Sequence, residues 1–138
     1  VLEMDFVSAV EKEIERFTEM TGVHVVSKVE PIGSLSSLVK EHSLYMLTEC
    51  LTNVAKHAKA DKVTVKVIKE SSFLSLLIKD NGIGMDTKTI GKQPGHYGLI
   101  GLQERTQLVG GSIDIFSQDK QGTSVCIKLP IQEKGVTA

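Results

Sequence analysis

The sequence contains no tryptophan, and aromatic residues make up only 4% of its 138 residues. A surface that stacks nucleobases needs several exposed aromatic rings, so this scarcity argues against a nucleic-acid-binding module. The net charge is −1, which gives the whole chain no field that would attract a polyanion. We therefore expect no direct nucleic-acid partner.

Cysteines and long apolar runs are also scarce. Cys50 and Cys126 are far apart in apolar segments, without the spacing of metal ligands, and we expect both to be buried, reduced thiols. No apolar run approaches the ~18 residues of a membrane span, and the first residues show no signal-peptide pattern. With 41% hydrophobic and 24% charged residues, the chain is expected to form one domain over 1–138, with a flexible tail at 131–138 and no direct membrane contact.

Periodicity predicts three helices and five strands. Apolar residues at helical spacing mark helices at about 5–20, 38–58 and 99–109. Alternating or β-branched segments mark strands at about 23–29, 63–68, 73–79, 112–116 and 123–129. Residues 86–97 have no clear period, which predicts a mobile loop. Two hairpins, a lone strand and three helices predict an α+β two-layer sandwich, a mixed sheet of about five strands with the helices on one face.

The first two predicted helices each carry an apolar stripe that we expect to be buried. In the first helix the stripe consists of Phe6, Val10, Ile14, Phe17 and Met20. In the second helix it consists of Leu44, Leu47, Leu51, Val54 and Ala58. Away from this second stripe, Glu49 and Asn53 lie one turn apart on one face, followed by Lys56 and His57. The side-chain oxygens of Glu49 and Asn53 suit Mg²⁺, although a polar helix face is more often simply solvated.

Three glycine-containing segments follow, and each is compatible with a bound nucleotide. Asp80-Asn81-Gly82-Ile83-Gly84-Met85 follows a strand; its glycines permit close backbone approach, and Asp80 can accept a hydrogen bond from an exocyclic amine. Gly98-Leu99-Ile100-Gly101-Leu102 opens a helix whose free N–H groups and dipole favour phosphate, without the pattern of a P-loop or dinucleotide fingerprint. Gly122-Thr123 starts the final strand. Taken alone, the first and last segments are more typical of an ordinary turn and an ordinary strand start.

Together these four segments resemble the ordered boxes of the superfamily that joins DNA gyrase, heat-shock chaperone, histidine kinase and mismatch-repair ATPases. The N box corresponds to Glu49–Ala58, and the glycine boxes to 80–85, 98–102 and 122–123, with Leu129-Pro130 closing the last strand. The likeness covers about residues 38–130. Within the superfamily, Glu49–Ala58 and His96–Arg105 are most similar to histidine kinases that work with nitrate-regulator-type response regulators.

The resemblance implies the ATP-binding catalytic domain of a bacterial two-component sensor histidine kinase, with a Bergerat-type fold and ATP and magnesium as cofactors. Asn53 would coordinate magnesium, and Glu49 would hold a metal-bound water or orient the incoming imidazole. Lys56 or His57 would touch phosphate, and Asp80 would bind the adenine amine. The further residues implied in nucleotide binding are Gly82, Gly84, Gly98, Leu99, Gly101 and Thr123.

The resemblance also implies where the phosphate acceptor lies, because the acceptor histidine of this family is typically followed by an acidic residue. The four histidines of the chain, none of which is followed by one, are His24, His42, His57 and His96. We therefore expect the dimerisation and phosphoacceptor domain of the same kinase upstream of Val1, and a response regulator as an indirect partner. The fragment is expected to be a monomeric cytoplasmic domain with little kinase activity alone; any membrane anchor of the parent lies outside it.

Two alternative functions fit parts of the pattern. A related protein-serine kinase would share the fold, but the His96–Arg105 run argues against it, and the acid lability of phosphohistidine separates the two. An interaction module that has lost ATP binding is disfavoured by the intact Glu49, Asn53, Asp80 and glycines. Magnesium-dependent nucleotide binding separates that alternative from the kinase.

Overall fold

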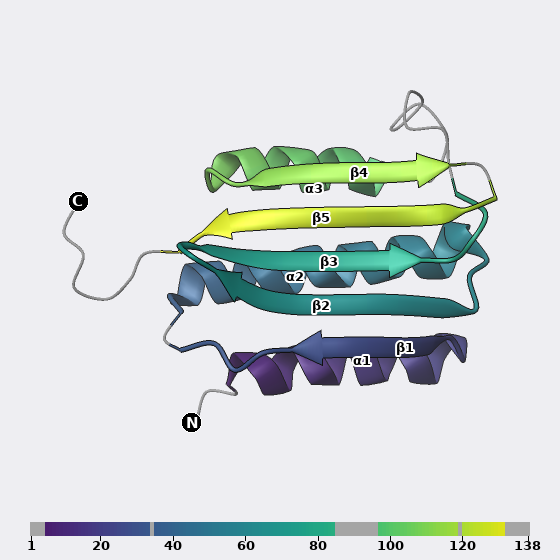
Figure 1. The fold of residues 1–138 in the computed structure, drawn as a ribbon, viewed down its shortest axis with the longest axis horizontal. Helices are drawn as coiled ribbons and strands as arrows, with labels where there is room; N and C mark the ends of the chain where they lie inside the picture. The colour runs from purple at the N-terminus through teal and green to yellow at the C-terminus, as the bar shows by residue number, and fades with distance from the viewer. Residues whose placement is uncertain (1–4, 34, 85–96, 119, 132–138) are drawn as a thin grey trace.

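The computed structural model describes residues 5–33, 35–84, 97–118 and 120–131. Its elements, in chain order, are α1 (Phe6–Thr21), β1 (His24–Val29), α2 (Ser37–Asn53), η1 (Val54–Ala58), β2 (Lys62–Glu70), β3 (Phe73–Asp80), α3 (Tyr97–Leu108), β4 (Ser112–Gln118) and β5 (Gly122–Pro130). The five strands form one sheet in the order β1-β2-β3-β5-β4, with β1 parallel to β2 and the other pairings antiparallel. The three α-helices lie behind one face of this sheet (Figure 1), which confirms the predicted α+β sandwich.

Alternation along the central strands determines which side chains meet the helices. Val63, Val65 and Val67 of β2 are fully buried, while the lysines between and beyond them are exposed. The buried side chains of the neighbouring strands continue this layer at Leu74, Leu76, Ile78, Val125, Ile127 and Leu129. Burial of aliphatic side chains between the sheet and the helices is therefore the main force that holds the two layers together.

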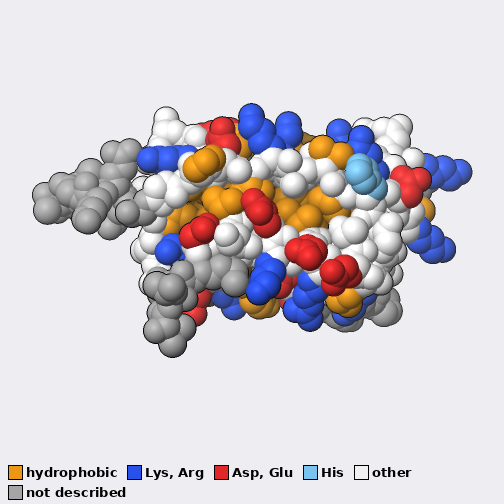
Figure 2. Space-filling view, turned by 90° about the horizontal axis from the view of Figure 1, so that it is seen from below, with side chains coloured by type: hydrophobic (Ala, Val, Ile, Leu, Met, Phe, Trp, Pro, Cys, Tyr) orange, Lys and Arg blue, Asp and Glu red, His pale blue; other side chains and the backbone are white. Residues whose placement is uncertain are grey.

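The first helix has clear signals at both ends. The Asp5 carboxylate accepts a hydrogen bond from the Ser8 N–H at 3.0 Å, which lowers the pKa of Asp5, and the helix ends at Gly22 with a φ of 73°. The expected stripe is buried except for Met20, which is 73% exposed. That prediction was wrong because the helix ends one residue later, and Met20 reaches the groove between α1 and α2 instead of the sheet. Around α1 and the β1 edge, Figure 2 shows charges of both signs beside exposed apolar side chains.

The second helix runs to Ala58 as predicted, but its last turn differs from an α-helix. Residues Val54–Ala58 form a π-helical turn, η1, directly after Asn53. The predicted stripe is buried except at Leu44, which is partly buried and packs on the core. Met46 and Cys50 are also buried, so the apolar face is wider than expected.

The two cysteines differ, which corrects the prediction that both are buried. Cys50 is enclosed in the core, and burial raises the pKa of its thiol to about 12. Cys126 is half-buried, because it alternates with Val125 and Ile127 and so points to the face of β5 away from the helices. Neither thiol forms a disulfide.

Some sequence predictions fall on residues without a description. The mobile loop predicted at 86–97, together with Met85, lies outside the described residues up to Tyr97, where α3 begins. The tail predicted to be flexible is described only at Ile131, which is buried. None of the described helices is long and apolar enough to cross a membrane.

Candidate functional site

Three of the predicted boxes meet at the end of the sheet where β3 ends and β5 begins. The Ala58 carbonyl at the end of η1 accepts a hydrogen bond from the Ile83 N–H at 2.7 Å. A Cβ on Gly82 would overlap that same carbonyl, and one on Gly122, where φ is 91°, would overlap the Asp80 carbonyl. At these contacts backbone packs directly on backbone. The first glycine box packs on the end of the N box, and the third glycine box packs on the first.

Asp80 lies at the centre of this junction and is 5% exposed. Its Oδ1 atom accepts hydrogen bonds from the Gly82 N–H at 2.8 Å and the Thr123 N–H at 3.3 Å. Burial raises the pKa of Asp80, and the two backbone donors partly oppose that rise. Among the described residues no donor reaches Oδ2, so this second oxygen is left to accept a hydrogen bond from a ligand.

Thr123 stands beside Asp80 and is itself fixed by Ser117, a residue that none of the sequence motifs contains. The Thr123 Oγ1 lies 2.8 Å from the Ser117 Oγ, and the Ser117 hydroxyl also lies 3.2 Å from the Gly122 carbonyl. The register of the β4–β5 hairpin places Ser117 opposite Thr123. The predicted strand ended at residue 116, so Ser117 fell in the predicted turn; extending the hairpin by one residue would have paired it with Thr123, because residues opposite each other across an antiparallel pair share a face.

Asn53 and Glu49 occupy the half-buried side of α2, as predicted from their spacing. Asn53 is followed by the π turn, and after five residues, about 7 Å of helix rise, the chain reaches the Ala58–Ile83 hydrogen bond. The Asn53 Nδ2 atom is buried, and no acceptor partner is found for it among the described residues. An unsatisfied buried donor is costly, so a ligand oxygen that accepts a hydrogen bond from the Asn53 Nδ2 atom would remove this cost.

The chemistry of these donors fits a magnesium ion held jointly with a nucleotide. Mg²⁺ prefers oxygen ligands and commonly keeps several waters while binding one or two protein groups and substrate phosphates. Within the described part of the chain, no group of three or more His, Cys, Asp and Glu side chains gathers into a preformed metal cage. The Asn53 carboxamide and the Glu49 carboxylate one turn earlier are protein oxygens on this side of α2 that could serve such an ion.

The two basic residues predicted as phosphate contacts face different surroundings. Lys56 is exposed and lines the groove between α1 and α2 with Phe17 and Met20. His57 is half-buried in the π turn. Of the two, His57 therefore sits on the less solvated part of the helix, whereas Lys56 lies beside the groove against α1.

The second glycine box occupies the first turns of α3, which begins two residues earlier than predicted. Leu99 is 2% exposed and belongs to the core, so only its backbone can face a ligand. Gly101 is exposed, and a Cβ there would meet no heavy atom of the described residues within 4 Å. The packing of the described chain does not require a glycine at this position, whereas a ligand lying against the helix would.

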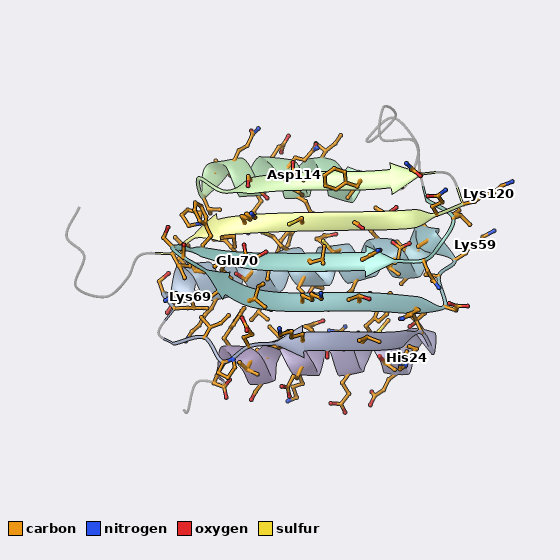
Figure 3. All side chains as sticks on the ribbon, in the orientation of Figure 1. His24, Lys59, Lys69, Glu70, Asp114 and Lys120 are labelled. Carbon is orange, nitrogen blue, oxygen red and sulfur yellow. The ribbon has the colours of Figure 1, made fainter. Side chains whose placement is uncertain are left out.

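The pairing of α3 with α2 orients this turn toward Asn53. The two helices run antiparallel (Figure 1), and Arg105 of α3 contacts Tyr45 and His42 of α2. Gly101, one turn or about 6 Å earlier on α3, is therefore carried toward the part of α2 that holds Glu49 and Asn53. Two exposed lysines, Lys59 and Lys120, project at the same end of the molecule (Figure 3) and add positive potential there.

Comparisons with known proteins find a matching family model and several similar proteins. Residues 40–133 match the model of the family described as histidine kinase-, DNA gyrase B-, and HSP90-like ATPase. The sensor histidine kinase YdfH of Bacillus subtilis (strain 168) is 37% identical over 120 residues, which cover 86% of this chain and 30% of that protein. The signal transduction histidine-protein kinase/phosphatase DegS of Brevibacillus brevis is 33% identical over 130 residues, covering 94% of this chain and 33% of that protein. The chain thus spans about a third of the length of these curated relatives.

Solved structures support the fold independently of close sequence similarity. The histidine kinase domain of the blue-light activated histidine kinase from Erythrobacter litoralis EL346 superposes with a TM-score of 0.80 at 18% identity, over 93% of this chain and 62% of that one. The mycobacterial sensor histidine kinase MprB superposes with a TM-score of 0.72 at 21% identity, over 96% of this chain and 99% of that one.

Proposed function

The chain belongs to the family of histidine kinase-, DNA gyrase B-, and HSP90-like ATPases, and from this membership we propose that it binds Mg-ATP and passes the γ-phosphate to a histidine on a separate dimerisation domain of the same kinase. Its homologues are sensor histidine kinases, in which this type of domain is the catalytic ATP-binding part. The adenine amine would bind at Asp80, and the phosphates would lie between Asn53 and the start of α3.

One observation supports the nucleotide assignment above the others, namely the state of the Asp80 carboxylate. Two backbone donors hold Oδ1, while Oδ2 accepts none among the described residues. The exocyclic amine of adenine is a donor of the right kind, whereas the corresponding carbonyl of guanine would repel the carboxylate. Burial makes the missing hydrogen bond costly, so a matching donor contributes both affinity and selectivity.

The transfer step requires positioning and charge neutralisation more than covalent help from the protein. When bound, magnesium supplies neutralisation of the phosphate charge. Asn53 would hold it through its carboxamide oxygen, with Nδ2 left to donate to a phosphate oxygen. Glu49 would orient a metal-bound water or the incoming imidazole, and the free N–H groups at the start of α3 would face the phosphates. We assign the phosphate contact of the N box to His57, because Lys56 borders the groove beside α1 instead.

We further propose that the parent kinase works with a response regulator of the nitrate-regulator type, an inference that rests on the His96–Arg105 run. The acceptor domain would be the direct partner of this chain and the regulator an indirect one. The relatives are about three times as long as the chain, which leaves room in a protein of that kind for the acceptor histidine.

Calorimetric titration of the chain with ATP and GTP, with and without magnesium, tests the binding proposal. We expect Asn53→Ala to abolish most of the affinity gained from magnesium, and Asp80→Ala to reduce the preference for ATP over GTP. Asp114→Asn is the matched control, because Asp114 is exposed on β4 toward the face without helices (Figure 3) and should bind like the parent. If both site variants also bind like the parent, the site assignment is wrong.

A phosphorylation assay tests the acceptor. In a kinase that joins this chain to its dimerisation domain, the ³²P label from ATP should be lost in acid and retained in alkali, as phosphohistidine requires. An acid-stable label would instead indicate the protein-serine kinase alternative. The absence of any magnesium-dependent nucleotide binding would indicate the interaction module.

A further inference from the structure

The side of α2 that holds Glu49 carries a second polar group one turn earlier. The Tyr45 hydroxyl donates to the Glu49 Oε1 at 3.4 Å, an i to i+4 contact along the helix. Glu49 is half-buried and Tyr45 is 42% exposed. The carboxylate to which the proposed function assigns a role at the phosphate end is therefore tethered from the side away from Asn53.

Tyr45 is in turn held by the neighbouring helix. The guanidinium carbon of Arg105 lies 3.8 Å from the centroid of the Tyr45 ring, well within the range of a cation–π contact. The Arg105 Nη1 also lies 3.1 Å from the His42 Nδ1. Because arginine has no acceptor, His42 accepts this hydrogen bond and carries its own proton on Nε2. Two contacts thus fix the guanidinium against α2, with its charge over the phenol.

This arrangement gives α3 a physical connection to Glu49. Arg105 lies eight residues, or about 12 Å of helix rise, after the start of α3 at Tyr97. A shift of α3 along or away from α2 would move the guanidinium, then the Tyr45 ring, and then the hydroxyl that restrains the carboxylate. A cation over the ring also draws electron density from the phenol, which strengthens its hydroxyl as a donor to Glu49.

We propose that Tyr45 and Arg105 are positioning residues that hold the Glu49 carboxylate in its productive orientation for phosphoryl transfer, Tyr45 by its hydrogen bond and Arg105 by fixing Tyr45. The inference rests on the proposed function, since it requires Glu49 to act at the γ-phosphate. Mutation of a residue that orients a metal ligand or catalytic group commonly lowers activity by about tenfold or more, although the residue does not touch the substrate. The effect should fall on kcat and leave the KM for ATP nearly unchanged, because neither residue is among those assigned to the nucleotide.

The test uses Tyr45→Phe, which keeps the stacked ring and removes only the hydroxyl. In a kinase that joins this chain to its acceptor domain, we expect kcat for histidine phosphorylation to fall about tenfold while the KM for ATP changes less than about twofold. Arg105→Gln should produce a similar fall, and the double variant should be no worse than the more impaired of the two single variants. Glu104→Gln, on the exposed neighbour of Arg105, is the control and should retain parental kcat.

Two further measurements separate positioning from a merely structural contact. In a Glu49→Gln background, Tyr45→Phe should cause no additional loss of kcat, because its effect passes through the carboxylate. The thermal midpoint of Tyr45→Phe should match that of the parent. If the parent phosphorylates its histidine and Tyr45→Phe does so at the same kcat, or if its loss is undiminished in Glu49→Gln, the positioning inference is wrong. If the parent itself forms no phosphohistidine, the proposed function fails instead.

Discussion

Two glycines of the site should respond to alanine in opposite directions, and this contrast tests whether a ligand occupies the space beside α3. Gly101 is exposed on α3, and a methyl group added there would meet no heavy atom of the described residues within 4 Å. Gly82 is buried, and a methyl group there would overlap the carbonyl of Ala58, which also accepts the Ile83 N–H. The packing of the protein itself therefore requires Gly82, whereas only a bound ligand would require a glycine at position 101.

The magnitudes follow from these surroundings. In a helix, alanine is favoured over glycine by about 1 kcal/mol, so Gly101→Ala should raise the free energy of unfolding by up to that amount and the midpoint by about 3 °C. Gly82→Ala must displace backbone and weaken one hydrogen bond, which should cost about 2–4 kcal/mol. The affinity for ATP should change differently from the stability. Gly101→Ala should bind ATP about tenfold more weakly than the parent, because its methyl group would press on the phosphates.

Chemical denaturation and calorimetric titration of the two variants measure these effects, with Gln107→Ala, on the exposed end of α3, as the control for changes in helix propensity. A Gly101→Ala variant that is both more stable and equally able to bind ATP would refute the placement of the phosphates beside α3. A Gly82→Ala variant as stable as the parent would contradict the close packing of the first glycine box on η1.

Three other predictions concern buried polar groups. Burial raises the folded-state pKa of Asp80 above its unfolded value of about 3.9, so its ionisation lowers the stability of the folded chain as the pH rises. The stability advantage of Asp80→Asn over the parent should therefore grow from about pH 4 upward and then level off. An advantage that shrinks with pH in denaturation curves would contradict this. The Ser43 hydroxyl is buried on α2 and no partner is found for it among the described residues, so Ser43→Ala should stabilise the chain by about 1 kcal/mol, whereas a loss of stability would mean that the hydroxyl is satisfied. Since burial raises the pKa of Cys50 to about 12 while Cys126 is half-buried, a thiol reagent at pH 8 should label one cysteine in the folded chain and two after unfolding, and Cys126→Ser should remove the rapid label.

The features that could be predicted from the sequence are those that depend on the spacing of residues within one helix or strand. The alternation of Val63, Val65 and Val67 predicted a half-buried strand, and the spacing of Glu49 and Asn53 predicted their shared helix face. Met20 shows the limit of such periodicity, because its spacing matched the buried stripe although it lies in the last turn of the helix, at the groove between α1 and α2, and is 73% exposed.

Features that depend on contacts between distant segments could not be predicted in this way. The π turn after Asn53 leads to a carbonyl that bonds Ile83, which lies 25 residues further along the chain than Ala58. One of the two backbone hydrogen bonds to the Asp80 Oδ1 atom comes from Thr123, which belongs to a different strand, β5. The contact of Arg105 with Tyr45 likewise exists only once α3 packs on α2. Local patterns identify such side chains but do not specify which of them meet.

The most direct test of a single nucleotide site follows the backbone amide signals of the isotopically labelled chain while a non-hydrolysable ATP analogue and magnesium are added. We predict that the largest shifts occur together, with one affinity, at Asn53, Gly82, Gly101 and Thr123. Shifts that leave these four amides unchanged and gather elsewhere, for example around Leu38 and Leu108 at the opposite end of the helices, would contradict the claim that they enclose one nucleotide.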